Sequence, residues 1–413
     1  MSDSTEVWLV RHAQSEANAA GLWQGRSDSA VSDRGFRQIE ALRRRFQDQR
    51  FDLVVTSPLL RARQTAAAFG DFEVDEAFLE VDLGNWEGKS WQELAATDLK
   101  ELLALGKGEN LRFGEVGESA EELTARVEIA LNGLFDRLAP GERALVVTHG
   151  GAIDVVLDRA FGRIGGQRVA AFSENTGITR MVRRHGQTRL AAFNDVAHLG
   201  PRPRSVERAL SEGRAVLALM RHARTAANVE GRWQGHTDWG LDEVGRSQAA
   251  ALASYYPSVS RVVSSPLGRA WETATHLHPV PESFDDLVEL GFGKWEGLTF
   301  SEINSEWPEL FERIFVHGED LARGETGETW EGLATRVRAA IDRVAPATGE
   351  VTAVVTHGAA IRGLLSSLVG GGWHQAQNWE TPANTSVTHL ILTERGLVLA
   401  DYANAAHLER WST

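Results

Sequence analysis

The chain has 413 residues, 42% of them hydrophobic and 24% charged, which is the composition of a compact, soluble protein long enough for two or three domains. A formal net charge of −14 argues against nucleic acid or an anionic membrane as the main partner, and the absence of cysteine excludes disulfides, thiolate nucleophiles and cysteine-ligated zinc. The start is polar and no apolar run reaches about 18 residues, so we expect a cytoplasmic protein without signal peptide or membrane span.

Three short apolar segments in the first half of the chain each end in a polar residue. Strands are predicted over residues 7–10, 53–56 and 144–148, and they lead into Arg11-His12, Ser57-Pro58 and His149-Gly150. A helix predicted over residues 59–69 has Arg61 in its first turn, and Glu80 lies in the loop before Trp86. Because ligands of open α/β sheets bind outside the carboxyl ends of the strands, we expect these side chains to converge there.

The predicted strands alternate with helical patterns, which is typical of an α/β domain. One helix is predicted over residues 121–138, and Ser119 with Glu122 forms a capping box at its start. We therefore expect a three-layer α/β/α domain whose central sheet is mostly parallel.

The second half of the chain repeats the first at an interval of 208 to 210 residues. Four anchors carry the repeat: Arg11-His12-Ala13 returns as Arg221-His222-Ala223, Ser57-Pro58-Leu59 as Ser265-Pro266-Leu267, Trp86-Glu87-Gly88 as Trp295-Glu296-Gly297, and Thr148-His149-Gly150 as Thr356-His357-Gly358. An interval of this length indicates duplication of a whole domain. We place the two domains at residues 1–199 and 215–413, joined by a proline-containing linker at 200–214. Two such copies could pack as an intrachain pseudo-dimer.

The residues expected at the strand ends of the first copy can transfer a phosphoryl group. The guanidinium groups of Arg11 and Arg61 can clamp the phosphoryl oxygens and neutralise the charge that develops during transfer. His12, kept neutral by these arginines, can attack phosphorus, while His149 binds the phosphoryl oxygens. Glu80 can protonate the leaving alcohol and then activate a water molecule. The same roles fall in the second copy on Arg221, His222, Arg269, Glu289 and His357.

Together these residues resemble the histidine phosphatase superfamily, in its phosphoglycerate-mutase-like branch, twice over nearly the whole chain. The motifs in the first copy are Arg11-His12-Ala13-Gln14-Ser15 with Asn18, Ser57-Pro58-Leu59-Leu60-Arg61-Ala62, Glu80 before Gly84-Asn85-Trp86-Glu87-Gly88, Gly117-Glu118-Ser119 and Thr148-His149-Gly150. The resemblance implies a phosphoglycerate-mutase-like fold, a phosphohistidine intermediate, a small-molecule phosphorylated substrate and no metal or organic cofactor. The substrate-binding positions expected with it are Ser15, Asn18 and Gly150 in the first copy and Thr225, Asn228 and Gly358 in the second. Ala13 and Ala223 stand where the family commonly has glycine, a small change that should leave the phosphate pocket open.

Several alternatives remain open at the level of sequence. Two histidines and a carboxylate also resemble a metal-binding triad, although two adjacent arginines would oppose a divalent cation. One copy could serve as a scaffold or phosphate-binding module, and a mutase uses the same histidine as a phosphatase. We favour hydrolysis because only residues 89–117 are available for the extended lid with which a mutase excludes water. The carboxylates that compete with Glu80 and Glu289 for the role of proton donor are Asp82, Glu87 and Glu296.

The two copies differ near their expected pockets, which predicts different substrates. Trp271 and Glu272 of the second copy replace Arg63 and Gln64 of the first. Of the 13 tryptophans, Trp8, Trp23, Trp86 and Trp91 lie in the first copy and the rest in the second, including Trp239, Trp271 and Trp330 near pocket motifs. We expect the second copy to accept a larger or more aromatic leaving group, unless these tryptophans pack the core or an interface between the domains.

Overall fold

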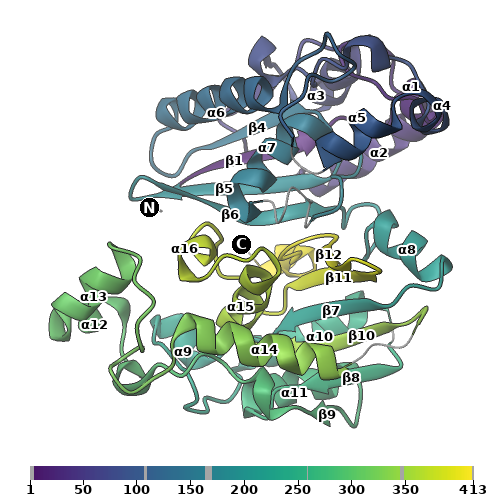
Figure 1. Cartoon of the computed structure of the whole chain (residues 1–413). Coiled ribbons are helices and arrows are strands. Elements are labelled where there is room, and N and C mark those ends of the chain that lie inside the picture. Colours follow the sequence, from purple (N-terminus) through teal and green to yellow (C-terminus); the bar gives the residue numbers. More distant parts are fainter. Residues whose placement is uncertain (1–3, 107–108, 163–169, 258, 345–347, 412–413) are drawn as a thin grey trace. The chain divides into compact units, whose positions relative to one another are not determined.

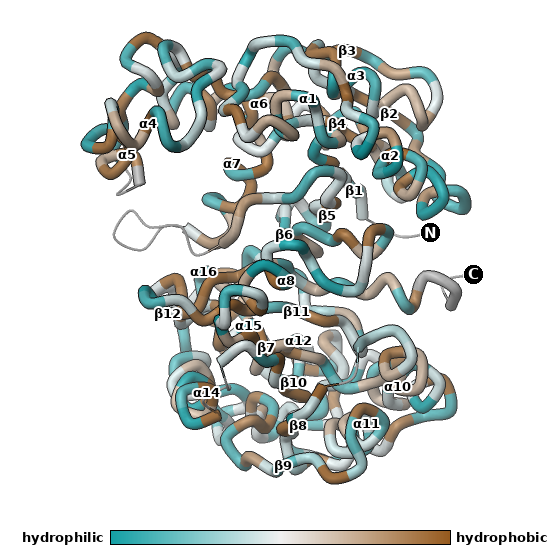
Figure 2. Tube along the Cα trace, turned by 90° about the vertical axis from the view of Figure 1, so that its right-hand side faces the viewer, coloured by the Kyte–Doolittle hydropathy of each residue, from teal (hydrophilic) through white to brown (hydrophobic). Residues whose placement is uncertain are grey.

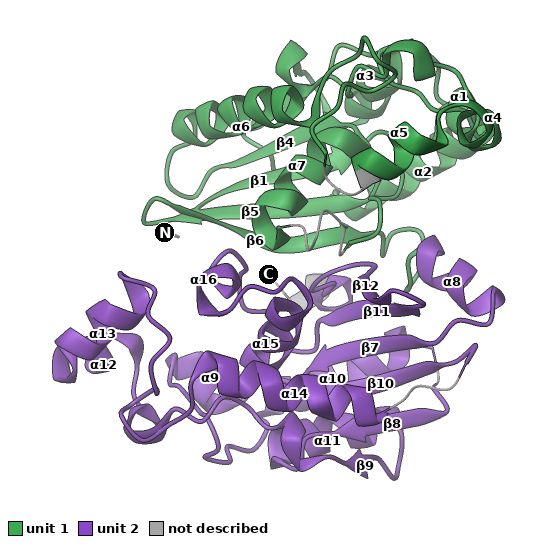
Figure 3. Cartoon of the chain, viewed as in Figure 1, with its two compact units in different colours: residues 1–203 green, residues 204–413 purple. Residues whose placement is uncertain are grey.

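The computed structural model describes residues 4–106, 109–162, 170–257, 259–344 and 348–411. The chain divides into two compact units, residues 1–203 (unit 1) and 204–413 (unit 2), which Figure 3 shows in different colours. Within the described ranges each unit is built on one six-stranded mixed sheet with helices around it (Figure 1). The α/β fold class predicted from the sequence, in two tandem copies, is confirmed.

The sheet of unit 1 combines four parallel strands with two antiparallel ones. Its strands are β1 (Ser4–Arg11), β2 (Leu53–Thr56), β3 (Glu73–Val74), β4 (Arg143–Thr148), β5 (Ile178–Arg184) and β6 (Gln187–Asp195), in the order β3-β2-β4-β1-β5-β6. The first four in this order are mutually parallel, and β5 and β6 run antiparallel to their neighbours. The helices are α1 (Glu16–Ala19), α2 (Asp33–Arg45), α3 (Leu60–Ala66), α4 (Trp91–Thr97), α5 (Leu99–Gly106), α6 (Ala120–Arg137) and α7 (Gly150–Phe161), with short 3₁₀ helices η1 (Ala67–Phe69), η2 (Glu76–Phe78) and η3 (Gly84–Trp86).

Unit 2 has the same topology, preceded by one extra helix, α8 (Arg204–Ser211). Its strands are β7 (Val216–Arg221), β8 (Arg261–Ser264), β9 (Glu282–Ser283), β10 (Val351–Thr356), β11 (Val387–Thr393) and β12 (Gly396–Leu399), in the order β12-β11-β7-β10-β8-β9. Read from the other edge, this is the order of unit 1. The remaining helices are α9 (Ala226–Glu230), α10 (Glu243–Tyr255), α11 (Gly268–Leu277), α12 (Phe300–Glu306), α13 (Pro308–Phe315), α14 (Trp330–Val344), α15 (Gly358–Leu368) and α16 (Trp373–Ala376), with 3₁₀ helices η4 (Asp285–Leu287), η5 (Gly293–Trp295) and η6 (Ala406–Trp411).

Alternate side chains of the central strands face different helical layers. In unit 1, Trp8 and Val10 of β1 pack in one buried cluster with Leu42 of α2 and Ala62 of α3. The residues between them point to the opposite face and are also buried, and α6 and α7 both contact β1. Figure 2 shows the same distribution along the trace, with hydrophobic residues (brown) in central strands such as β10 and hydrophilic ones (teal) on helices such as α2. The result is the expected three-layer arrangement.

Parallel pairing of the two central strands positions the pocket of each unit. In unit 1, Arg11 at the end of β1 pairs with Thr148 at the end of β4, and in unit 2 Arg221 pairs with Thr356. Because both strands end at the same edge of the sheet, the next residue of each lies at that edge too. Thus the two histidines that follow the strands of each copy come from distant parts of the sequence and become neighbours.

Helix boundaries agree closely with the sequence predictions, with one difference in the linker. Helix α6 begins after the predicted capping box of Ser119 and Glu122, and the predicted helix over residues 59–69 is an α-helix followed by a 3₁₀ turn. Within the range 200–214, predicted above to be a proline-containing linker, lies helix α8, whose Val206 and Ala209 are buried in the core of unit 2. These apolar residues stand three positions apart on one face, a helical pattern that the flanking prolines and charges obscure. No helix in the described ranges is long and apolar enough to cross a membrane.

A buried ion pair ties the end of α2 to the end of β6. The guanidinium of Arg45 forms two hydrogen bonds with the carboxylate of Asp195, at 2.7 and 2.5 Å, and the two side chains are only 8% and 6% exposed. Although burial opposes ionisation, the charge of Arg45 keeps the pKa of Asp195 below its ordinary value. Removing one partner of such a pair leaves the other charge buried without compensation.

We therefore predict that Arg45→Met lowers the free energy of unfolding of unit 1 by about 3 kcal/mol or more. Arg43→Met, on the same helix but with an exposed side chain paired to Glu40, should leave the free energy of unfolding nearly unchanged. Urea denaturation of the full chain, followed by tryptophan fluorescence, measures both variants. Equal losses in the two variants would contradict a special contribution from the buried pair.

Candidate active site

The strand ends of unit 1 bring two buried histidines together. His12 follows β1 and His149 follows β4, and their ring centroids lie 5.0 Å apart. The guanidinium Nε of Arg61, in the first turn of α3, donates to Nε2 of His12 at 3.2 Å. The other two nitrogens of Arg61 donate to the carbonyl oxygens of Gly25 and Ser27, at 2.7 and 2.9 Å. Backbone carbonyls thus fix the arginine against the histidine ring.

Hydrogen bonding also fixes the tautomer of His12. Its Nδ1 lies 2.7 Å from the carbonyl oxygen of Ala13. A carbonyl oxygen can only accept, so Nδ1 carries the proton and Nε2 keeps its lone pair. The ring nitrogen that faces Arg61 is therefore the nucleophilic one.

Both histidines of unit 1 are held in the neutral form. Burial lowers the pKa of His12 well below its ordinary value, and the positive charges of Arg61 and Arg11 lower it further. The pKa of His149 is lowered well below its ordinary value by burial and by Arg61. Burial lowers the pKa of Arg61 to about 10, which still leaves this side chain charged at neutral pH. The pocket therefore combines neutral imidazoles with cationic guanidinium groups.

Several polar atoms of the pocket are buried without a partner in the described part of unit 1. Arg11 donates through Nη1 to the carbonyl oxygen of Ser173 at 2.5 Å, but its Nε has no acceptor among the described residues. His149 accepts or donates at Nε2 with the Ser57 hydroxyl at 2.7 Å, while its Nδ1 has no described partner. Unsatisfied buried donors are costly, so these atoms are suited to bind an anion.

Glu80 is the carboxylate that the fold places beside the strand ends that carry the two histidines. Its Oε1 accepts hydrogen bonds from the amides of Val81 and Gly151, each at 2.9 Å. A Cβ atom on Gly150 would lie 3.8 Å from both Glu80 Oε2 and Arg11 Nε, so the carboxylate and the guanidinium face the same point. Burial raises the pKa of Glu80, which favours its protonated form.

The competing carboxylates of unit 1 have other partners. Glu87 accepts hydrogen bonds from the amide of Gly25 at 2.7 Å and the hydroxyl of Ser27 at 2.6 Å, and so holds the loop whose carbonyls bind Arg61. Asp82 accepts from the amide of Gly84 at 2.9 Å and pairs with Arg26 at 3.6 Å. Of the carboxylates considered from the sequence, Glu80 is therefore the one turned toward the histidine pocket.

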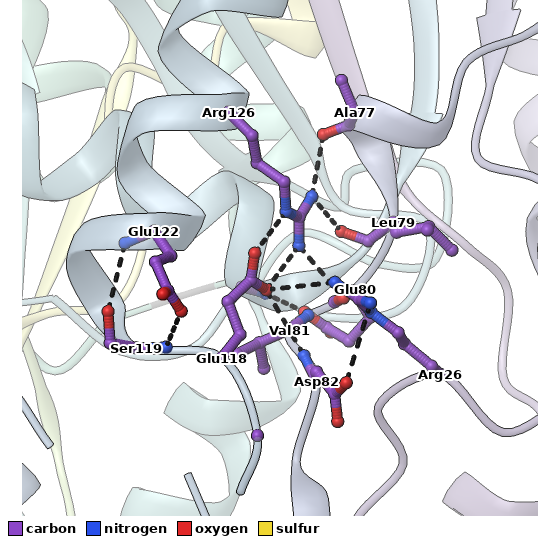
Figure 4. Close-up of polar contacts among 12 residues, drawn as sticks. Arg26, Ala77, Leu79, Glu80, Val81, Asp82, Glu118, Ser119, Glu122 and Arg126 are labelled. Carbon is purple, nitrogen blue, oxygen red and sulfur yellow. Dashed lines mark hydrogen bonds and ion pairs between the residues drawn. The ribbon is translucent and has the colours of Figure 1, made fainter. Parts of the chain in front are cut away.

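An arginine that the sequence prediction missed fixes the loop of Glu80. Arg126 of α6 donates to the carbonyl oxygens of Ala77, Leu79 and Glu80, at 2.8, 2.9 and 3.1 Å, as Figure 4 shows. Its guanidinium also forms a double hydrogen bond with Glu118, at 2.6 and 2.8 Å. In unit 2 the same contacts are made by Arg336 with Asp286, Val288, Glu289 and Glu328. The signal in the sequence is a glutamate followed eight residues later by an arginine, present in both copies.

Asparagines near the carboxyl edge of each sheet were also missed. The side-chain amide of Asn175 donates to the carbonyl oxygen of His12 at 3.0 Å and to Asn18 at 3.1 Å. Asn384 makes the matching bonds to His222 and Asn228, at 2.9 and 3.2 Å. No motif marked these residues, because each lies in an irregular segment between the last helix and the antiparallel strands.

The residues expected to bind substrate have mixed surroundings. Ser15 and Thr225 are buried N-caps, whose hydroxyls accept from the amides of Asn18 and Asn228 and contact Gln24 and Gln234. Asn228 lines the pocket of unit 2. Gly150 and Gly358 are the first residues of α7 and α15, immediately after the histidines. Substrate binding by these six residues stays a prediction.

Unit 2 repeats the arrangement with small differences. The ring centroids of His222 and His357 lie 5.2 Å apart, and Nδ1 of His222 donates to Ala223 at 2.7 Å. Arg269 donates to the carbonyl oxygens of Gly235 and Thr237, at 2.7 and 3.0 Å. The other contacts join Arg221 to Pro382 at 2.6 Å, His357 to Ser265 at 2.8 Å, and Glu289 to the amides of Leu290 and Ala359 at 2.8 and 3.3 Å. Burial lowers the pKa of Arg221 to about 10 and, together with Arg221 and Arg269, lowers that of His222 well below its ordinary value.

The histidine of unit 2 opens into a cavity of about 260 Å³. Its lining includes Arg221, His222, Arg269 and Glu289. A cavity of about this volume is suited to a small molecule. In the described part of the chain, no group of three or more histidine, aspartate or glutamate side chains is arranged to hold a metal ion.

Fold and site together define a pair of α/β domains, each with a histidine and arginine pocket suited to a phosphoryl group. The sequence model of the histidine phosphatase superfamily (branch 1) matches residues 7–196 and 217–405. The chain belongs to this superfamily, in two tandem copies.

Curated relatives and solved structures cover one copy at a time. A bifunctional protein of Mycobacterium tuberculosis is 37% identical over 166 residues, 38% of this chain and 44% of its own length, so the match spans less than half of that protein. A metal-independent phosphoserine phosphatase of Arabidopsis thaliana is 31% identical over 201 residues, 46% of this chain and 82% of its own. A crystal structure of phosphoserine phosphatase from Entamoeba histolytica, in complex with 3-phosphoglyceric acid, is 27% identical with a TM-score of 0.43, over 47% of this chain and 99% of that one.

The buried neutral histidines predict how stability depends on pH. Because the folded-state pKa of His222 lies below that of the unfolded chain, the unfolded state binds more protons as the pH falls through about 6.5, and stability is lost. Between about pH 7.5 and pH 5.5 this single group should cost about 1.4 kcal/mol. We expect His222→Gln to remove that part of the pH dependence, as measured by urea unfolding at both pH values.

The control is His276→Gln, which changes an exposed histidine of the same unit. It should leave the pH dependence of unfolding as it is in the unmodified chain. Parallel curves for all three proteins would mean that His222 titrates in the folded protein as it does in the unfolded one.

Proposed function

We propose that both units are phosphoric monoester hydrolases, which release phosphate from small molecules through a phosphohistidine intermediate. One observation carries the proposal: each pocket holds a buried, neutral histidine whose proton lies on Nδ1, with two cationic arginines and a second neutral histidine beside it. This combination leaves Nε2 unprotonated, so that its lone pair can attack phosphorus while the phosphoryl charge is neutralised.

In the first step, Nε2 of His12 forms a bond to phosphorus as the bond from phosphorus to the ester oxygen breaks. Arg11 and Arg61 bind the phosphoryl oxygens, and the unpartnered Nδ1 of His149 donates a further hydrogen bond to them. Glu80, whose pKa is raised by burial, enters this step in its protonated form and gives its proton to the departing alkoxide. The products of this step are an alcohol and phosphohistidine, with Glu80 left as a carboxylate.

In the second step, the Glu80 carboxylate removes a proton from water, whose oxygen attacks phosphorus. The bond between phosphorus and Nε2 breaks, inorganic phosphate leaves, and His12 and Glu80 regain their starting forms. In unit 2 we assign the same steps to His222 and Glu289, with the phosphoryl oxygens bound by Arg221, Arg269 and His357. No metal or organic cofactor takes part in either step.

Hydrolysis is favoured over phosphoryl transfer to a second substrate position. The segment between Gly88 and Gly117 is short for a lid that excludes water, and a curated relative is a metal-independent phosphoserine phosphatase. The cavity of unit 2 supports a small-molecule substrate, and the acidic net charge of the chain argues against nucleic acid.

If both pockets are catalytic, His12→Ala and His222→Ala should each leave partial phosphate release from a generic phosphomonoester such as p-nitrophenyl phosphate. The double variant should lose activity by at least about 100-fold, since each change removes one nucleophile. The control pair is His185→Ala and His276→Ala, one exposed histidine in each unit. Complete loss of turnover in either folded single variant would contradict independent action of the two units.

The phosphohistidine pathway predicts that a chelator leaves phosphate release unchanged. Rapid acid-free quenching during turnover should trap phosphate that is labile in acid and stable in base, attached to His12 or His222 in peptide mapping. Loss of activity with a chelator, restored by a divalent ion, would support a metal-dependent hydrolysis instead.

A further inference from the structure

The cavity of unit 2 carries more positive charge than one phosphate group uses. Among the described residues, its lining includes one carboxylate, Glu289, and five arginines, Arg221, Arg232, Arg269, Arg323 and Arg362. Arg232 is paired with Glu230 at 2.7 Å and Glu302 at 3.2 Å, so its charge is offset. Arg221 and Arg269 belong to the histidine pocket, and we call the two remaining arginines of the lining, Arg323 and Arg362, the second cationic site.

Arg323 is a buried cation that is incompletely satisfied. Its side chain is only 1% exposed, and its Nη1 donates to Asp320 at 2.9 Å and also to the carbonyl oxygen of Leu321. Its Nη2 is buried without a partner in the described part of the chain. Asp320 is shared, since it also accepts from the amides of Trp330 and Glu331, at 2.7 and 2.8 Å. An unpaired donor on a buried charge favours binding of an anion from the cavity.

Two tryptophans hold the second cationic site in place. The guanidinium of Arg323 lies 4.7 Å from the ring centre of Trp373, and that of Arg362 lies 5.3 Å from the ring centre of Trp330. Trp330 donates through its indole nitrogen to Ser366 at 2.9 Å, and Trp373 donates to the carbonyl oxygen of Ile314 at 2.8 Å. The indoles are thereby fixed with their faces against the arginines, an arrangement that keeps both cations ordered at the cavity wall.

Two of the tryptophans singled out from the sequence lie elsewhere. Neither Trp239 nor Trp271 is among the described residues that line the cavity, whereas Trp330 and Trp233 are. The faces of Trp330 and Trp373 are against arginines, and Trp233 packs against Phe292 and Trp295. The expectation that unit 2 accepts a larger or more aromatic leaving group stays a prediction. The charge of the residues near the pocket distinguishes the two units more specifically.

The corresponding positions of unit 1 have different chemistry. Arg323 precedes Gly324, whose φ is +54°, and the matching residue before Gly114, with φ +51°, is Phe113. Arg362 is the fifth residue after His357, and the fifth after His149 is Asp154. Besides burial, which is the main cause, the Asp154 carboxylate contributes to the raised pKa of Glu80, so its charge acts on the pocket of unit 1. At one position the two units thus carry opposite charges.

We propose that the second cationic site binds a further anionic group of the substrate. Unit 2 then hydrolyses phosphomonoesters that carry a second carboxylate or phosphate, and unit 1, with Asp154 at its pocket, takes phosphomonoesters without one. This specificity rests on the proposed phosphatase function of both units. The second anion pairs with Arg323 and Arg362 at the cavity wall while the scissile phosphate occupies Arg221 and Arg269.

Full-length variants with one active unit test the proposal. His12→Ala leaves unit 2 active and His222→Ala leaves unit 1 active. The substrates are propyl phosphate, its ω-carboxylate analogue 3-phosphonooxypropanoate, and 1,3-propanediol bisphosphate, which share a three-carbon chain. In the His12→Ala protein we expect kcat/KM to be at least about 10-fold higher for one of the two charged analogues than for propyl phosphate. The preferred analogue identifies the second group as carboxylate or phosphate.

Substitution within the second cationic site should reduce this preference. In the His12→Ala background, Arg323→Met and Arg362→Met should each lower the ratio of kcat/KM for the charged analogue to that for propyl phosphate by about 10-fold. Arg362→Lys should retain part of the ratio, because lysine keeps the positive charge but lacks the planar set of donors of a guanidinium group. Arg343→Met, an exposed arginine on α14, is the control and should leave the ratio unchanged.

A reciprocal change keeps the test valid should a buried arginine prove necessary for folding. In the His222→Ala background, Asp154→Arg should raise the ratio for the charged analogues by about fivefold in unit 1. Equal kcat/KM for the three substrates in unit 2, or ratios unaffected by both Arg362→Met and Asp154→Arg, would overturn the second anion site. Absence of phosphate release from every substrate in the unmodified chain would instead refute the phosphatase function on which the site depends.

Discussion

Parallel pairing of β1 with β4, and of β7 with β10, is the constraint on which each pocket depends. The register places Arg11 opposite Thr148 and Arg221 opposite Thr356, so the histidine that follows each strand emerges at one edge of the sheet. A shift of one residue in either strand would turn its side chains to the opposite face. The contacts between the two imidazoles, and the access of both to the same anion, therefore follow from backbone hydrogen bonds in the middle of the sheet.

Burial at this edge lowers the pKa of both kinds of basic side chain, with different consequences for their charge. Histidine loses its proton when it is buried beside arginine, whereas the guanidinium keeps its charge even with a pKa near 10. The cost of burying Arg61 is offset by carbonyl oxygens of Gly25 and Ser27, and that loop is in turn held by Glu87. The same depth of burial that makes His12 a nucleophile raises the pKa of Glu80 and readies it as an acid.

The sequence was sufficient for the fold class and for the residues that the strand ends carry, because short apolar segments and their last residues are local features. It was not sufficient for Arg126, whose partners are mainly backbone carbonyls of residues 77–80, or for Asn175, which bonds the carbonyl oxygen of His12. Every residue type has a backbone carbonyl group, so the sequence does not indicate which carbonyl groups accept these hydrogen bonds. Helix α8 was missed because a stripe of only a few apolar residues is short against the proline and arginine residues around it. The difference between Asp154 and Arg362 could be interpreted only after the structure placed Arg362 in the lining of the cavity of unit 2.

Chain length between the two copies has changed most in connections that enter the amino ends of parallel strands. Helices α2 and α10 are both 13 residues long and 210 positions apart, whereas the strands after them, β2 and β8, are 208 apart, so two residues were lost or gained in between. Changes of one residue precede β3 and β9, then α6 and α14, and later β5 and β11, and a change of two residues precedes β4 and β10. Both two-residue changes lie in connections that enter the amino ends of parallel strands, at the edge of the sheet opposite the histidines. The amino edge of each sheet is therefore where a loop can be lengthened, a tag inserted or the chain reopened, with the histidine edge left in register.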